Sequence, residues 1–167
     1  HETSGGLKTF VESYRKRTQL QTPQPTITNI YNLVESISPL FPAIKWEYAS
    51  INNTNVKTDE GLFRQIVINM AKNAQEAGAT RLSFQLVPSN APNAAIALLV
   101  SNDGAPIPTE LRKDIFTPFF TTKQMGSGIG LSLSRQIMVL QGGDLQLADV
   151  PSPEFHTTFI ISFAPIY

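Results

Sequence analysis

"EGLFRQIVINMAKNAQEAG", residues 60–78, predicts the helix around which the rest of the fold is arranged. Its apolar side chains form one stripe at helical spacing. The members of this stripe are Phe63, Ile66, Val67, Met70, Ala74 and Ala77. Asp59 precedes the helix as an N-cap, and Gly78 ends it as a C-terminal cap. We therefore expect a long helix with one face against a core.

A polar row runs along the same helix, because Gln65, Asn69, Asn73 and Glu76 share one face. Asparagine costs roughly 0.5 kcal/mol or more relative to alanine in a helix interior. Two asparagines one turn apart therefore call for a compensating use. A solvated face is one interpretation, and a row reaching a metal ion and phosphates is the other, since amide oxygens suit magnesium.

The segments on either side of this helix predict a mixed sheet. Apolar alternation or continuous apolar runs indicate strands at residues 44–51, 56–59, 80–87, 94–101, 144–150 and 156–163. Helical spacing indicates further helices at residues 6–20, 27–41, 108–116 and 127–141. There is no regular strand–helix–strand alternation. We expect an α+β fold, a two-layer α/β sandwich whose mixed sheet has helices packed on one face.

The stretch "QTPQPT", residues 21–26, breaks the chain with two prolines. The domain boundary is placed there. Residues 1–22 are expected to be the end of a helix and a linker, and residues 23–167 one domain.

Composition excludes several classes of function. Lys+Arg and Asp+Glu are each 13, so no basic field indicates a nucleic-acid partner. The absence of cysteine excludes a disulfide framework and a thiolate zinc site, and is compatible with the reducing cytoplasm. The longest apolar run, "AAIALLV", is too short to span a bilayer.

A glycine-rich loop precedes the last predicted helix in "MGSGIGLSLSRQIM", residues 125–138. Gly126, Gly128 and Gly130 alternate with other residues, a spacing that matches neither a Walker loop nor a Rossmann fingerprint. A flexible turn would explain it. Its position at a helix N-terminus, with Lys123 just before it, favours an anion, because free N–H groups and the helix dipole attract negative charge.

The stretch "VSNDGAPIP", residues 100–108, follows a predicted buried strand. Asn102, Asp103 and Gly104 are ordinary turn residues and need no function. A polar side chain at the end of a core strand is also suited to accept a hydrogen bond from the exocyclic amine of a purine. A glycine two residues later would let the ring approach the backbone.

Taken in order, four stretches resemble the ATP-binding domain of sensor histidine kinases, whose wider superfamily shares the Bergerat fold. They are "FRQIVINMAKNAQEA" for the N box, "SNDGAPIP" for the first glycine box, "IFTPFFTTK" for the F box and "GSGIGLSLSRQI" for the second glycine box. The upstream "LKTFVESYRK" resembles the end of the second dimerisation helix in kinases of the nitrogen-regulator type.

The resemblance implies ATP and Mg2+ as cofactors, with Asn73 coordinating the metal and with Asn69 and Lys123 as catalytic residues. The nucleotide-binding residues that it implies are Asn73, Asn102, Asp103, Gly104, Ile107, Lys123, Gly126, Ser127, Gly128, Ile129, Gly130 and Leu131. ATP-hydrolysing relatives carry a glutamate at the position of Asn69. Since an amide cannot take a proton, Asn69 favours phosphoryl transfer over hydrolysis.

The first glycine box departs from the family's D-x-G-x-G pattern. Asn102 stands at the position of the adenine-reading aspartate, and Pro106 at that of the second glycine. The Asn102 oxygen can accept from the adenine amine, but without a charge. Asp103 would replace it only if the turn shifted by one residue.

The resemblance also implies partners: a phosphoacceptor-histidine segment of the same kinase, a response regulator, and a second copy in a full-length homodimer. The parent would be membrane-bound, with this domain in the cytoplasm. The chain has two histidines, His1 and His156. We expect neither to be the acceptor, and His156 to be structural or exposed. A degenerate binding module and a hydrolytic ATPase are the alternatives.

Overall fold

The structure is a computed structural model, and it describes residues 22–51, 54–89, 95–117, 130–149 and 152–166. The predicted helix at residues 6–20 lies outside the described residues. The assignment of residues 1–22 to a helix end and linker therefore stays a prediction.

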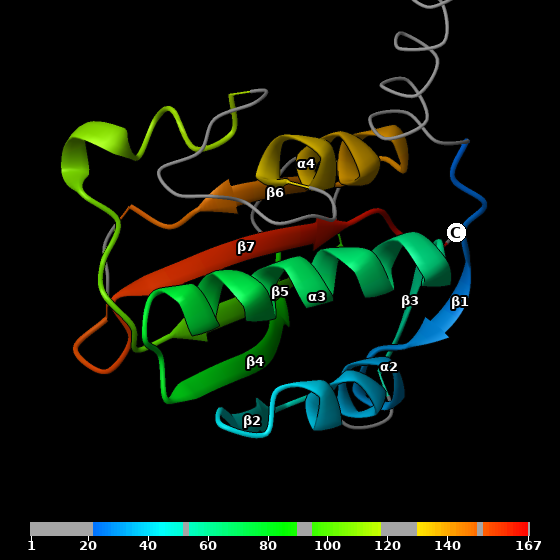
Figure 1. The fold of residues 1–167 in the computed structure, drawn as a ribbon. Helices are drawn as coiled ribbons and strands as arrows, with labels where there is room; N and C mark the ends of the chain where they lie inside the picture. The colour runs from blue at the N-terminus through cyan, green and yellow to red at the C-terminus, as the bar shows by residue number, and fades with distance from the viewer. Residues whose placement is uncertain (1–21, 52–53, 90–94, 118–129, 150–151, 167) are drawn as a thin grey trace, which may run out of the picture.

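A five-stranded mixed sheet forms one layer of the fold (Figure 1). Its strands, in spatial order, are β2 (Lys45–Ala49), β4 (Arg81–Pro88), β5 (Ile96–Asn102), β7 (Thr157–Phe163) and β6 (Asp144–Leu147). The β2–β4 pair is parallel, and the other pairs are antiparallel. A separate two-stranded sheet pairs β1 (Thr26–Asn29) with β3 (Asn55–Thr58). The predicted strand at residues 56–59 is thus real but does not join the main sheet.

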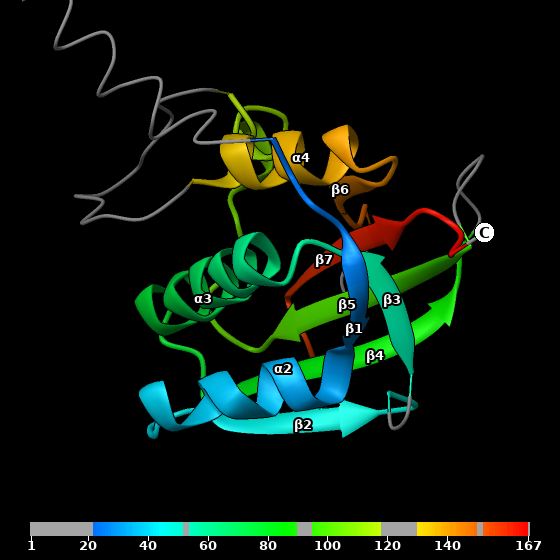
Figure 2. The same ribbon diagram turned by 90° about the vertical axis from the view of Figure 1, so that its right-hand side faces the viewer.

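Three helices of the described residues cover one face of this sheet (Figure 2). They are α2 (Ile30–Ile37), α3 (Glu60–Glu76) and α4 (Leu131–Leu140). Short 3-10 turns occupy Ser38–Leu40 and Thr109–Leu111. This arrangement confirms the predicted two-layer α+β sandwich. Within the described residues, no helix is long and apolar enough to cross a membrane.

The core lies between the two layers, and strand alternation creates it. In β4 the side chains of Leu82, Phe84 and Leu86 are buried, while those between them are more exposed. The register sets Phe84 opposite Val100 on the next strand. From the helix layer, Phe63 packs edge-on against Phe163, with ring centroids 5.4 Å apart.

The central helix α3 begins and ends as its sequence predicts. The Asp59 Oδ1 accepts a hydrogen bond from the Leu62 N–H at 3.0 Å, which satisfies one of the free donors of the first turn. Gly78 follows the C-cap with a φ of 77°, a left-handed conformation that glycine adopts without strain. Both predicted caps are therefore confirmed.

The predicted helix at residues 27–41 is wrong at its start. Thr26–Asn29 forms strand β1, since its β-branched residues pair with β3, and α2 begins only at Ile30. Asn29 caps α2 by accepting from the Asn32 N–H at 2.8 Å. The predicted helix at 108–116 is also wrong. The segment forms a short 3-10 turn at Thr109–Leu111 in place of an α-helix, with hydrogen bonds between residues three apart, such as that from the Leu111 N–H to the Pro108 carbonyl.

Candidate functional site

The polar row of α3 does not share one environment. Asn69 is 6% exposed and Asn73 is half-buried, whereas Gln65 and Glu76 are exposed. Within the described part of the chain, the buried Asn69 Nδ2 has no hydrogen-bond partner. An unpaired buried donor costs free energy, and few native side chains leave one unused. The Asn69 amide therefore offers a donor to a ligand oxygen.

Asn102 ends strand β5 and is 5% exposed. Its Oδ1 accepts a hydrogen bond from the Gly104 N–H at 2.9 Å. Because an N–H must meet an acceptor, this bond fixes which way the amide faces. Oδ1 has a second lone pair, so Asn102 keeps the capacity to accept from a ligand amine.

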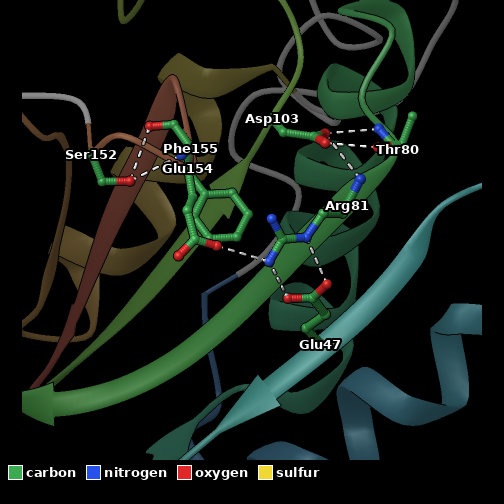
Figure 3. A network of polar contacts seen from close by, with 7 residues as sticks. All are labelled: Glu47, Thr80, Arg81, Asp103, Ser152, Glu154 and Phe155. Carbon is green, nitrogen blue, oxygen red and sulfur yellow. Dashed lines mark hydrogen bonds and ion pairs between the residues drawn. The ribbon is translucent and has the colours of Figure 1, made fainter.

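Asp103, the next residue, is engaged elsewhere (Figure 3). Its Oδ1 accepts from the N–H groups of Thr80 and Arg81 at 2.8 and 2.9 Å, and its Oδ2 accepts from the Thr80 Oγ1 at 2.7 Å. Burial alone would raise the pKa of this carboxyl, but these hydrogen bonds outweigh it and lower the pKa. The carboxylate of Asp103 thus fastens the turn to the start of β4.

Gly104 lies where no other side chain fits. A Cβ there would lie 2.7 Å from the Ala77 Cβ and 2.8 Å from the Ala77 carbonyl oxygen. From the sequence, this glycine was expected to let a purine ring approach the backbone. The structure shows that a glycine is needed here because the turn closely approaches the end of α3. The next residue confirms this contact, since the Ala105 N–H donates to the Ala77 carbonyl at 2.8 Å.

The turn and the asparagine row are linked by backbone hydrogen bonds. The Ala77 N–H donates to the Asn73 carbonyl, and the Ala77 carbonyl accepts from Ala105. The first glycine box is therefore held one helical turn from Asn73. Ile107, further along the same loop, is half-buried against the core.

The N-terminus of α4 provides the third part of the site. Gly130 is its N-cap and accepts from the Ser134 N–H at 3.0 Å, and Leu131 is half-buried against the core. No described atom lies within 4 Å of a Cβ placed on Gly130, so neither packing nor φ requires glycine there. The free N–H groups of such a first turn attract an anion.

Helices α3 and α4 meet where α3 begins and α4 ends. Gln141, just after α4, accepts a hydrogen bond from the Asp59 N–H at 2.7 Å. The N-terminal end of α4 and the Asn69–Asn73 half of α3 both extend away from this junction on the same side (Figure 1). The N-terminal end of α4 therefore lies on the same side of the fold as the second half of α3.

Five predicted site residues lie outside the described residues: Lys123, Gly126, Ser127, Gly128 and Ile129. Their part in binding stays a prediction. Within the described residues, the turn after β5 is hydrogen-bonded to the end of α3, and α4 begins on the same side of the α3–α4 junction as the second half of α3 (Figure 1).

Sequence reasoning did not place two residues, Thr157 and His156, next to the turn. Thr157 is 4% exposed and is paired directly with Asn102 across the β5–β7 ladder. Threonine is common at the start of a strand, so its residue type indicates no special position. Only the pairing of β7 with β5 shows that Thr157 lies beside Asn102. His156, expected on that strand, instead precedes it, is exposed, and has its Nδ1 2.8 Å from the Gly104 carbonyl oxygen.

Arg81 organises the edge of the sheet beside this turn (Figure 3). Its Nε and Nη2 donate to Glu47 at 2.7 and 2.9 Å, and Nη2 also donates to Glu154 at 3.1 Å. The hydrogen bond from Arg81 lowers the pKa of Glu47, and both carboxylates raise the pKa of Arg81. The guanidinium also lies 4.7 Å from the centre of the Phe155 ring. The segment before β7 is thus tied to β4 and β2.

The donor set fits a nucleotide better than a metal cage. Among the described residues, no group of three or more His, Cys, Asp or Glu side chains is placed to hold a metal ion. Mg2+ needs no such cage, because it keeps several waters and binds through few protein oxygens together with substrate phosphates. The Asn73 amide beside the unpaired Asn69 fits that pattern.

Comparison with known proteins agrees with this geometry. Residues 58–166 match the family described as histidine kinase-, DNA gyrase B-, and HSP90-like ATPase. The chain is 32% identical over 110 residues to the signal transduction histidine-protein kinase AtoS of Escherichia coli (strain K12), a match covering 66% of this chain and 18% of that protein. It is 38% identical over 90 residues to the sensor protein FixL of Bradyrhizobium diazoefficiens, covering 53% of this chain and 18% of FixL.

Among solved structures, the catalytic domain of histidine kinase ThkA in a nucleotide-free form has a TM-score of 0.69 and 28% sequence identity. That match covers 84% of this chain and 95% of the ThkA domain. The chain thus spans less than a fifth of the two sensor proteins but nearly all of an isolated catalytic domain. The match over residues 58–166 establishes that the chain belongs to the histidine kinase-, DNA gyrase B- and HSP90-like ATPase family, as an ATP-binding domain of the sensor histidine kinase type.

Proposed function

We propose that this domain binds ATP with Mg2+ and transfers the γ-phosphoryl group to a histidine on a dimerisation segment of the same kinase. The observation that carries the proposal is the Asn69 amide, which is buried with an unpaired donor one turn from Asn73. A glutamate there would serve as a base for water. An amide takes no proton and therefore orients phosphate or metal-bound water without activating it.

The roles of the residues follow from their chemistry. The Asn73 amide oxygen would hold the metal, which when bound neutralises phosphate charge and lowers the barrier to transfer. Asn69 would donate from its Nδ2 to an oxygen at the same place. At the other end of the nucleotide, the second lone pair of the Asn102 Oδ1 would accept from the adenine amine.

The phosphate chain would lie at the start of α4. Gly130 and Leu131 open this helix, and the preceding glycine loop with Lys123 would supply further N–H donors and a positive charge. Positioning and charge neutralisation supply most of the catalysis in phosphoryl transfer, so such a site needs no general base of its own.

The proposal extends to the parent protein. Residues 1–22 would end the second dimerisation helix and its linker, as in nitrogen-regulator-type kinases, and residues 23–167 would be the catalytic domain. The parent would act as a membrane-bound homodimer, with this domain in the cytoplasm and a response regulator as its partner. The solved complex of ThkA with the response regulator TrrA, of similar fold, supports that partner class.

The test is a calorimetric titration of the chain with ADP, with and without Mg2+, followed by a transfer assay. The parent's dimerisation segment, added in trans with γ-labelled ATP, should become labelled on its histidine. Magnesium-independent ADP binding would contradict the metal role. Absence of any nucleotide binding would leave the domain as a binding module, and release of free phosphate without transfer would make it a hydrolase.

A further inference from the structure

The turn after β5 contains one flexible point, and both of its flanks are held. Gly104 has the backbone freedom of glycine about its Cα, so its two neighbouring peptide planes can rotate unless each is fixed. The plane on the N-terminal side is fixed by the bond from the Gly104 N–H to the Asn102 Oδ1 at 2.9 Å. This is the same oxygen on which base recognition is proposed to depend.

The plane on the C-terminal side is fixed by two further contacts. The Ala105 N–H donates to the Ala77 carbonyl at 2.8 Å. The carbonyl oxygen of Gly104, on the same plane, lies 2.8 Å from the His156 Nδ1. Because a carbonyl can only accept, Nδ1 carries the proton in this contact. His156 is therefore the donor that holds this plane from the β7 side.

The imidazole is itself held in place by its neighbours in the chain. Thr157 follows His156 and is paired with Asn102 in the β5–β7 ladder. Glu154 and Phe155 precede it, and both contact the Arg81 guanidinium. Since the backbone on each side is anchored, only the side-chain torsions of His156 have to be ordered when it binds the turn.

We propose that His156 is a positioning residue for the purine end of the nucleotide site. It fixes the Gly104 carbonyl and thereby orders the glycine whose N–H donates to the Asn102 Oδ1. This inference rests on the proposed nucleotide-binding function, and it adds a residue outside the four sequence boxes. His156 acts through the turn and does not itself contact the nucleotide.

The test compares His156→Ala with His156→Asn, because the asparagine Nδ2 occupies nearly the same place as the histidine Nδ1 and keeps the donor. Ser152→Ala is the matched control. It removes the two hydrogen bonds between the Ser152 hydroxyl and the Phe155 backbone, while the Ser152 N–H still donates to the Phe155 carbonyl and the Gly104 contact is untouched. Two quantities are measured: the exchange rates of the Gly104 and Ala105 amide protons, and the affinity for ADP.

We expect His156→Ala to speed exchange of both amides and to weaken ADP binding by about three- to tenfold, the scale of one lost hydrogen bond. His156→Asn should restore both, and Ser152→Ala should change neither. Unchanged exchange in His156→Ala, or equal losses in His156→Asn, would overturn the positioning role. Failure of the unaltered chain to bind ADP would instead refute the proposed function, while the exchange rates would still test the contact.

Discussion

Asn102 and Asp103 are neighbours in the chain, but their side chains serve different parts of the structure. The Asn102 Oδ1 accepts from Gly104 inside the turn, whereas the Asp103 carboxylate accepts from Thr80 and Arg81 at the start of β4. The carboxylate therefore supports the strand, whereas the amide stays with the turn and is buried beside its ladder partner Thr157.

Because the two side chains have different partners, substituting each should have a different effect on the affinity for ADP. Asn102→Ala should weaken ADP binding by about 1–2 kcal/mol, because a buried hydrogen-bonding partner of the base is lost. Asp103→Ala should lower the free energy of unfolding and leave the ADP affinity of the folded domain nearly unchanged. Calorimetry and urea unfolding of both variants separate the two effects. The reverse ranking would mean that the first glycine box is aligned one residue too early.

Asp103 also predicts a pH dependence of stability. Its pKa is lowered in the folded protein from the ordinary value of 3.8, so its stabilising contribution is complete above that value and is lost as the pH falls through the folded pKa. The stability advantage of the unaltered chain over Asp103→Asn should therefore shrink on acidification. Urea unfolding from about pH 7 to about pH 3 measures it.

Glu47 contributes little to that difference. Its pKa is also lowered, chiefly by the hydrogen bond from Arg81, which both proteins keep; the Asp103 charge is the smallest of the causes acting on Glu47 and raises its pKa. An advantage that stays constant down to the lowest pH would show that the Asp103 charge contributes nothing to stability.

The sequence predicted α3 well because its signals are local. Asp59, the 3.6-residue stripe and Gly78 are all read within one segment, and both ends of α3 agree with them. Strand β1 was missed because four residues next to a strong helical pattern carry little signal of their own. Its pairing with β3 is a long-range contact that local propensity does not contain.

The candidate site is accessible to sequence reasoning only in part, for the same reason. Asn69, Asn73 and Asn102 stand out by residue type and spacing, and the structure buries Asn69 and Asn102 and leaves Asn73 half-buried; their roles in binding stay predictions. The contact of His156 with Gly104 joins residues 52 positions apart. Only the register of β7 against β5 brings that pair together, so no local pattern indicates it.

Substituting Asn73 should weaken Mg2+-dependent ADP binding more than substituting an exposed residue of the same polar row. Asn73→Ala is expected to weaken ADP binding in the presence of Mg2+ by about 1–3 kcal/mol, since a polar partner is lost. Gln65→Ala, an exposed change two turns earlier on the same helix, should leave the affinity unchanged. Calorimetric titration of both variants is the measurement. An ADP affinity of Asn73→Ala equal to that of the unaltered chain would show that Asn73 is not part of the site.

Gln141 should contribute to stability through the junction of α3 and α4. Its Oε1 accepts from the Asp59 N–H at 2.7 Å and from the Thr58 Oγ1 at 3.3 Å. Gln141→Ala leaves a partly buried N–H unpaired and should cost about 1–3 kcal/mol in the free energy of unfolding. Gln136→Ala, at an exposed position of α4, is the control and should change it little. Equal unfolding midpoints for Gln141→Ala and the unaltered chain would show that water replaces the hydrogen bonds made by the Gln141 side chain.

The chain on its own should not become phosphorylated when it is incubated with γ-labelled ATP. Transfer needs an acceptor nitrogen in line with the γ-phosphate at about 3–3.5 Å. His156 has its Nδ1 engaged with the Gly104 carbonyl, at the turn assigned to the base rather than to the phosphates. Slow hydrolysis is not expected either, since Asn69 cannot act as a base. Acid-labile label on the chain, retained in His156→Asn, would place the acceptor at His1, and label lost in that variant would place it at His156. Either result would contradict transfer to a separate segment.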